Sequence, residues 1–85
     1  MLRYSELSTS QKELIGEMRK GYELRYIHAT YHYCLYDSNG FFIDRIARRT
    51  AESLINRHYI YSCFTDGNKT VFCVNIEIEG FGTEF

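Results

Sequence analysis

Residues 46–60, IARRTAESLINRHYI, are the stretch from which the fold of this chain can be worked out. Small and apolar side chains recur there at helical spacing, which predicts an amphipathic helix. These inward positions are Ala47, Ala51, Leu54 and Ile55. The opposite arc is polar and largely basic, and it carries Arg45, Arg48, Arg49, Glu52, Asn56 and Arg57. We therefore expect a helix over about 45–58, with Asp44 or Thr50 as the cap at its start.

An earlier helix is predicted over about 9–20. Ser8 and Ser10 are both suitable N-caps, because each is followed three residues later by Gln or Glu, the spacing of a capping box. Gly21 can supply the left-handed residue that ends such a helix. The apolar stripe on this helix consists of Leu14, Ile15 and Met18.

The segment between the two helices is typical of β-structure. It is rich in aromatic and β-branched residues with partial alternation, which favours strands. Asn39 and Gly40 can adopt the positive φ angles of a tight hairpin turn. The expected strands lie near 23–28, 31–36 and 41–43.

The end of the chain predicts a β-hairpin over 59–78. Two alternating segments flank the turn sequence TDGNK, which places Lys69 near the tip. Cys63 and Cys73 lie at equal distances from Asn68, so we expect them to face each other as reduced thiols. The expected core combines both helices with this hairpin and consists of Leu14, Ile15, Met18, Leu54, Ile55, Ile60 and Phe72.

These elements define an α+β fold in the order α-β-β-β-α-β-β. A chain of 85 residues can bury one modest core, so a single domain over 1–85 is expected. No apolar run approaches the roughly 20 residues that span a bilayer, and the first residues lack the apolar core of a signal peptide. We expect a cytoplasmic protein without a membrane partner.

Charge and cysteine content narrow the function classes. The net charge of −1 argues against a general polyanion binder, although the basic residues concentrate in 45–57 and leave the remainder acidic. Three cysteines without a Cys-x-x-Cys pair do not suggest a metal site, and no cofactor motif is present. No triad order, phosphate loop or paired-carboxylate signature indicates an enzyme.

The segment RRTAESLINRHYI resembles the recognition helix of winged helix-turn-helix domains, and the hairpin 59–78 would be the wing. The layout of the chain is also similar to that of small prophage-encoded proteins. One departure from the winged-helix pattern is that strands are expected between the two helices, where a middle helix normally braces the recognition helix. The resemblance implies a small winged-helix-like domain.

The basic helix allows two interpretations. Arg45, Arg48 and Arg49 could contact phosphates or base edges, with Lys69 on the wing reaching a neighbouring groove. The alternative is a solvated helix face on which Arg48 and Glu52 pair.

The tyrosines suggest a second kind of contact. One or two of those in the central strands should be exposed, with Tyr31 and Tyr33 as candidates, and exposed tyrosine is enriched in protein interfaces. Stacking on bases is the rival use of such rings.

The function we expect from the sequence is that of a small, non-catalytic binding protein of phage or mobile-element type. It would inhibit a host nucleic-acid-handling or defence complex in the host cytoplasm by occupying its surface, and it resembles anti-CRISPR proteins in style. The alternative is a winged-helix transcriptional regulator that binds double-stranded DNA. The expected partner is a protein or nucleoprotein complex, and a homodimer is open.

Overall fold

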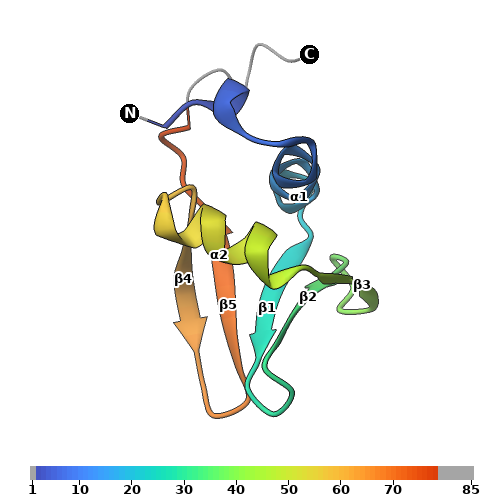
Figure 1. Cartoon of the computed structure of the whole chain (residues 1–85). Helices are drawn as coiled ribbons and strands as arrows, with labels where there is room; N and C mark the ends of the chain where they lie inside the picture. The colour runs from blue at the N-terminus through green and yellow to red at the C-terminus, as the bar shows by residue number, and fades with distance from the viewer. Residues whose placement is uncertain (1, 79–85) are drawn as a thin grey trace.

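The structure is a computed structural model that describes residues 2–78 (Figure 1). These residues form two α-helices, a short 3-10 helix and five strands, joined by turns and loops. Residue 1 and residues 79–85 of the predicted domain lie outside the described range. In chain order the elements are η1 (Tyr4–Glu6), α1 (Thr9–Arg19), β1 (Glu23–Ile27), β2 (His32–Tyr36), β3 (Phe42–Ile46), α2 (Arg48–Asn56), β4 (Ile60–Thr65) and β5 (Lys69–Val74).

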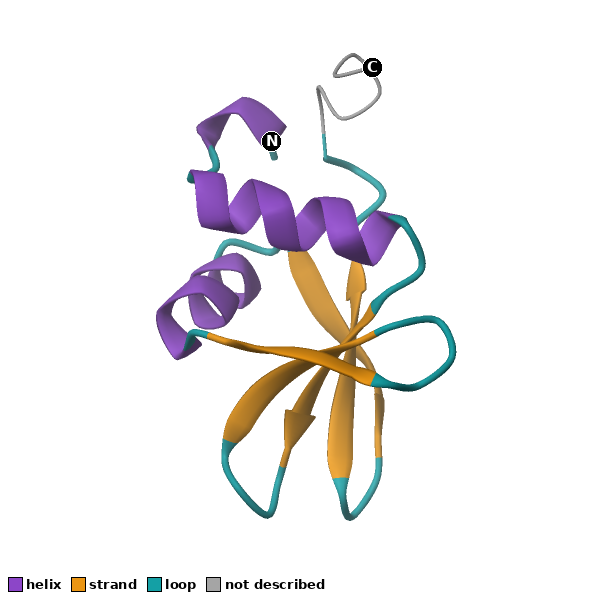
Figure 2. Cartoon of the chain, turned by 90° about the vertical axis from the view of Figure 1, so that its right-hand side faces the viewer, coloured by secondary structure: helices purple, strands orange, loops and turns teal. Residues whose placement is uncertain are grey.

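All five strands belong to one antiparallel sheet with the order β3-β2-β1-β5-β4. Helix α2 lies beside this twisted sheet, and α1 crosses above one end of its strands (Figure 2). The predicted α+β class is confirmed, with η1 as an element that was not foreseen. The β4–β5 hairpin is continuous with the rest of the sheet, because residues 69–72 of β5 pair with β1. Within residues 2–78, neither helix has the length and hydropathy to traverse a lipid bilayer.

Helix α1 begins and ends where its sequence signals predict. Ser8 accepts a hydrogen bond from the Gln11 backbone N–H, and the Gln11 side chain accepts one from the Ser8 N–H, so the capping box is complete. Gly21 adopts a φ of 104°, and the N–H of Tyr22 bonds back to the carbonyl of Glu17 at 3.1 Å. This is the Schellman arrangement that ends a helix with a left-handed residue.

Gln11 also joins the two helices, and its removal should be costly. Its side-chain amide donates to Ser53 Oγ in α2 at 2.9 Å, and the residue is buried. Gln11→Ala removes this bond and the side-chain half of the capping box, so we expect a loss of about 1–2 kcal/mol in the free energy of unfolding. Urea denaturation measures the loss, with Glu13→Ala in the same helix as an exposed control. Equal stability of the two variants would contradict the proposed role of Gln11.

At Gly16, a substitution is expected to stabilise the protein. It lies in the interior of α1, and a Cβ built there meets no atom within 4 Å. Alanine loses less backbone entropy than glycine in a helix, so Gly16→Ala should raise the free energy of unfolding by about 0.5–1 kcal/mol. Thermal unfolding followed by circular dichroism tests this, and a lower melting temperature for Gly16→Ala would disprove open space at this position.

Helix α2 is shorter than predicted, because strand β3 extends to Ile46. Asp44 and Arg45, expected at the start of the helix, instead pair with β2 opposite Leu35 and Cys34. The residue that precedes the helix is Ala47, which offers no side-chain cap, so the predicted cap at Asp44 or Thr50 was wrong. Pairing between neighbouring strands, a tertiary interaction, overrides the local helical pattern here.

The end of α2 is set by a histidine in a glycine-like conformation. His58 has a φ of 67°, and the N–H of Tyr59 bonds to the Leu54 carbonyl at 2.9 Å. The helix therefore closes in a second Schellman motif, and Tyr59 is turned into the core. The predicted end near His58 was two residues late, since Asn56 is the last helical residue.

The core lies between the helices and one face of the sheet. Five of the seven predicted core residues are buried, and the two others, Ile55 and Phe72, pack against them partly exposed. Tyr59, Leu24 and Leu35 join them in the buried cluster. The predicted residues that are buried are Leu14, Ile15, Met18, Leu54 and Ile60.

The expectation that Cys63 and Cys73 remain reduced thiols is corrected by the structure, which joins them in a disulfide. Tyr61 lies opposite Cys73 in the register, and a bulge after Ser62 leaves Cys63 without a direct partner. From there its sulfur reaches Cys73 across a Cα–Cα distance of 5.9 Å. The pairing was predictable from the spacing, whereas the bond requires the proximity that the bulge creates.

Reduction of this disulfide should destabilise the hairpin. The bond closes a loop with a sequence separation of 10 residues. Chain-entropy arguments assign about 2.5–3 kcal/mol to a loop of this size. Urea denaturation with and without dithiothreitol measures the loss, and Cys34→Ser should show the same sensitivity to reductant. Thiol titration of the unreduced, denatured protein should find only Cys34 free among the three cysteines, and a titre of all three would refute the bond.

Candidate functional site

The outer face of α2 brings together most of the polar residues predicted as a binding site. Arg48, Arg49, Glu52, Asn56 and Arg57 line one shallow surface with Ser53. Arg45 is not part of this group, because it lies in β3. Lys69 is also separate from it, at the start of β5.

Arg48 is held within the protein by several contacts. Its guanidinium donates to Glu52 Oε2 at 3.0 Å and to the Tyr31 carbonyl oxygen at 2.8 Å. It also lies 6.0 Å from the centre of the Tyr33 ring. These contacts pair the arginine with a carboxylate and orient it along the protein surface.

The other two arginines of α2 differ in their surroundings. Arg57 lies 4.0 Å from a Glu6 carboxylate oxygen and 5.1 Å from the centre of the Tyr59 ring. Arg49 is exposed and forms no ion pair with any residue in 2–78. Counting only ion pairs within residues 2–78, the outer face of α2 thus has one unpaired cation rather than the dense basic patch that the sequence predicts.

Of the two tyrosines expected at the surface, Tyr33 is buried and Tyr31 is exposed. Tyr33 is only 7% exposed, so its assignment as a surface contact was wrong. Burial, and next the Glu52 carboxylate, raise the pKa of Tyr33, and its protonated hydroxyl donates to Glu52 at 3.5 Å. Tyr31 is 66% exposed and has a φ of 59°, a left-handed conformation unusual for a bulky residue. It lies in the β1–β2 turn, next to Arg48.

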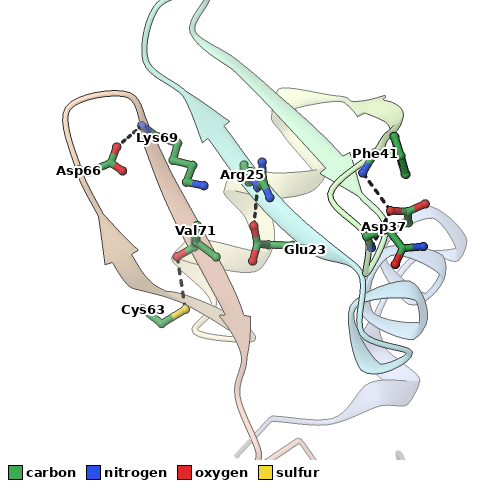
Figure 3. A network of polar contacts seen from close by, with 9 residues as sticks. Glu23, Arg25, Asp37, Phe41, Cys63, Asp66, Lys69 and Val71 are labelled. Atoms are coloured by element: carbon green, nitrogen blue, oxygen red, sulfur yellow. Dashed lines mark hydrogen bonds and ion pairs between the residues drawn. The ribbon is translucent and has the colours of Figure 1, made fainter.

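A different surface lies on the face of the sheet opposite α2. Side chains alternate along each strand, so Leu24 and its register partners Leu35 and Phe72 point to the core, and the side chains of the other face form what we call the open face. The strand register aligns these side chains in rows across the sheet. Figure 3 shows part of the open face, with Glu23 and Arg25 on β1 beside Val71 and Lys69 on β5.

Two rows of side chains contain most of the aromatic and charged residues of the open face. The register places five residues in each row, one from every strand in the order β3-β2-β1-β5-β4. The first row is formed by Phe42, Tyr36 and Glu23 and is continued by Cys73 and Tyr61, because Glu23 and Cys73 are the neighbours of Leu24 and Phe72, the last pair between β1 and β5. The second row is Arg45, Cys34, Arg25, Val71 and Phe64.

Arg25 is the central side chain of the open face. Its guanidinium forms an ion pair with Glu23 on the same strand and lies 4.1 Å from the centre of the Tyr36 ring on β2. Tyr36 in turn meets Phe42 edge-on, with ring centres 6.0 Å apart. A cation and two aromatic rings are thereby held in fixed positions on β1, β2 and β3.

The other flank of the open face is formed by β4 and β5. Tyr61 and Phe64 on β4 are 51% and 53% exposed, and Phe42 on the opposite edge strand is 58% exposed. A shallow hollow lies along β5, and it is lined by Phe64, Val71 and Lys69 together with Met18 and Arg19 at the end of α1. Beyond it, the backbone N–H groups of Asn68 and Lys69 bond to Asp66 and hold the pKa of its carboxyl below the ordinary value.

Sequence reasoning missed the open face, although its signal was present. Phe42, Tyr61 and Phe64 lie in strands that alternate, and each was predicted to be in a strand or at its end. Alternation separates two faces of a strand but does not tell which face the helices cover. Without the helix positions, these rings could equally have belonged to the core.

Within residues 2–78, no three His, Cys, Asp or Glu side chains come close enough to share a metal ion. The open face is thus a surface of aromatic and basic side chains rather than a cluster of ligands. Comparison with protein-family models, curated proteins and solved structures finds no match to this chain.

Proposed function

We propose that this protein is a small, non-catalytic binding protein of phage or mobile-element type that inhibits a host nucleic-acid-handling or defence complex. It would act in the host cytoplasm by occupying the surface of that complex with the open face of its sheet. The observation that carries the proposal is the set of three largely exposed rings, Phe42, Tyr61 and Phe64, on the open face of the sheet.

The size of the open face supports a binding role. Five strands at spacings of about 4.8 Å give a width of roughly 19 Å, and five residues at about 3.3 Å give a length of roughly 17 Å. An exposed patch of a few hundred Å² with aromatic side chains is typical of an interaction site.

The winged-helix regulator is supported less well by the geometry. Arg45 lies in β3, and Arg48 is engaged with Glu52 and Tyr31. Lys69, expected on a wing beside the recognition helix, lies on the open face, whereas α2 lies on the other side of the sheet. A duplex in contact with α2 would therefore leave Lys69 on the far side.

Phage challenge tests the proposal. A panel of bacterial hosts, each with one defined defence system, is infected with and without the protein. We expect restored plaque formation in at least one host, and loss of that effect in a Phe42→Ser/Tyr61→Ser/Phe64→Ser variant. Phe41→Ser/Ile76→Ser is the matched control, because both residues are exposed but lie outside the two rows. Unchanged plaque counts throughout the panel would contradict inhibition.

A second measurement addresses the alternative function. Binding of duplex DNA is compared for the wild type and an Arg45→Ala/Arg48→Ala/Arg49→Ala variant at two salt concentrations. Duplex binding that falls steeply with salt and disappears in the variant would favour the regulator, because each phosphate contact adds to the salt dependence. Absence of duplex binding by the wild type agrees with the inhibitor.

A further inference from the structure

The charges of the open face differ in sign from those of the whole chain. Arg25, Arg45 and Lys69 lie on this face, and Glu23 is the acidic residue within its rows. Asp66 at the hairpin turn adds a second carboxylate, which backbone N–H groups bind, so three cations stand against two carboxylates. The chain as a whole has a net charge of −1. Folding therefore collects a local basic excess on the one face that also exposes aromatic rings.

The distribution of groups on the open face does not match a typical protein interface. Protein interfaces concentrate apolar side chains at the centre and place charges at the rim. Here the order is reversed, because the Arg25–Glu23 ion pair occupies the central strand. The exposed rings lie on the two edge strands, with Phe42 on β3 and Tyr61 and Phe64 on β4.

Rings separated by cations suit a flexible, negatively charged strand. Single-stranded nucleic acid is held by stacking of its bases on aromatic side chains and by attraction of its phosphates to basic residues. Between Phe42 and the two rings of β4, the open face offers Arg25 and Lys69, and Arg45 lies beside Phe42 on β3. The bases of a duplex are already stacked on each other and cannot use these rings.

We propose that the open face binds single-stranded nucleic acid, with Phe42, Tyr61 and Phe64 as stacking platforms and Arg45 and Lys69 as phosphate contacts. This inference rests on the proposed function and deepens it. It specifies that the protein would bind the single-stranded nucleic acid that the host complex handles. Arg25 is a positioning residue in this scheme, since its contact with Tyr36 supports the ring that meets Phe42.

Fluorescence anisotropy with a labelled 15-nucleotide oligothymidylate tests the inference, with oligouridylate, a duplex of equal length and polyglutamate as further probes. We expect both single strands to bind more tightly than the duplex or polyglutamate. Loss of each ring, in Phe42→Ser, Tyr61→Ser or Phe64→Ser, should weaken oligothymidylate binding by roughly 5- to 100-fold. Arg45→Gln/Lys69→Gln should flatten the salt dependence.

Controls make each outcome decisive. Phe41→Ser/Ile76→Ser should bind oligothymidylate as the wild type does, and circular dichroism shows that each variant is folded. No binding of either single strand overturns the inference. Equal affinity for polyglutamate, the duplex and the single strands, with no effect of ring removal, also overturns it, because attraction of charge alone would then explain binding. Preference for polyglutamate would point to an acidic protein partner instead.

Failure of this inference differs from failure of the proposed function. If single strands do not bind but the three rings are still needed for inhibition in the phage challenge, the inhibitor function stands and its contact is with protein. If single strands bind through the rings but no host of the panel is affected, inhibition fails and the nucleic-acid site stands.

Discussion

Replacement of Tyr59 by alanine is expected to lower the free energy of unfolding by about 3–5 kcal/mol, the range for large aromatic residues removed from a core. Tyr59 is 2% exposed and directly follows the left-handed His58 that ends α2. Its hydroxyl donates to the Arg3 carbonyl at 2.8 Å and accepts from the Arg3 N–H at 3.1 Å. One side chain thus packs the core and ties the start of the described chain to β4.

Two further variants separate these roles in urea denaturation. Tyr59→Phe keeps the ring and loses only the hydroxyl, so a smaller cost of about 1–2 kcal/mol is expected. Tyr61→Ala, two residues later on the open face, should change stability by less than about 0.5 kcal/mol. If Tyr59→Ala were no more destabilised than Tyr61→Ala, the burial of Tyr59 would be refuted.

Leu54→Ala should be nearly as damaging, with a loss of about 2–5 kcal/mol. The Leu54 side chain is fully buried in the cluster that α1, α2 and the sheet share, and its carbonyl accepts the bond from Tyr59 that closes the helix. The measurement is the midpoint of urea denaturation, with an unchanged slope showing that the same surface unfolds. Asn56→Ala, exposed in the last turn of α2, is the control. A midpoint equal to that of the control would place Leu54 outside the core.

Local signals were sufficient for α1. Its capping box and its terminal glycine lie within a few residues of the bonds that they form, so the sequence could specify both ends. The strands and the β4–β5 turn were also recognisable, because Asp66 and its neighbours satisfy the backbone of the turn locally. Short-range hydrogen bonding makes such elements predictable from sequence.

The boundary between β3 and α2 could not be predicted in the same way. Asp44 and Arg45 fit the polar arc of a helix, but their backbone groups pair with β2, which lies several residues earlier in the chain. The end of α2 at His58 was equally hidden, because a left-handed histidine carries no clear local signal. In both places the contact that decides the structure is made by residues that are distant in sequence or conformationally atypical.

The candidate site was also predictable only in part from local sequence. The arginines of α2 were correctly placed on one helix face, yet the sequence could not show that Arg48 bonds to the Tyr31 carbonyl in another turn. Tyr33 was expected outside and is buried, while Phe42, Tyr61 and Phe64 lie exposed. Alternation predicted that each strand has two different faces, without indicating which of them the helices would cover.

By itself, the sequence determined the α+β class, the first helix, the existence of the strands and the small core, because these follow from periodicity, capping and turn chemistry between near neighbours. Only the tertiary structure decided the strand order, the bond between Cys63 and Cys73, and the open face with its central Arg25. The physical reason is that burial, strand register and disulfide proximity depend on which distant segments pack together. That choice is made by the whole core rather than by any single stretch of residues.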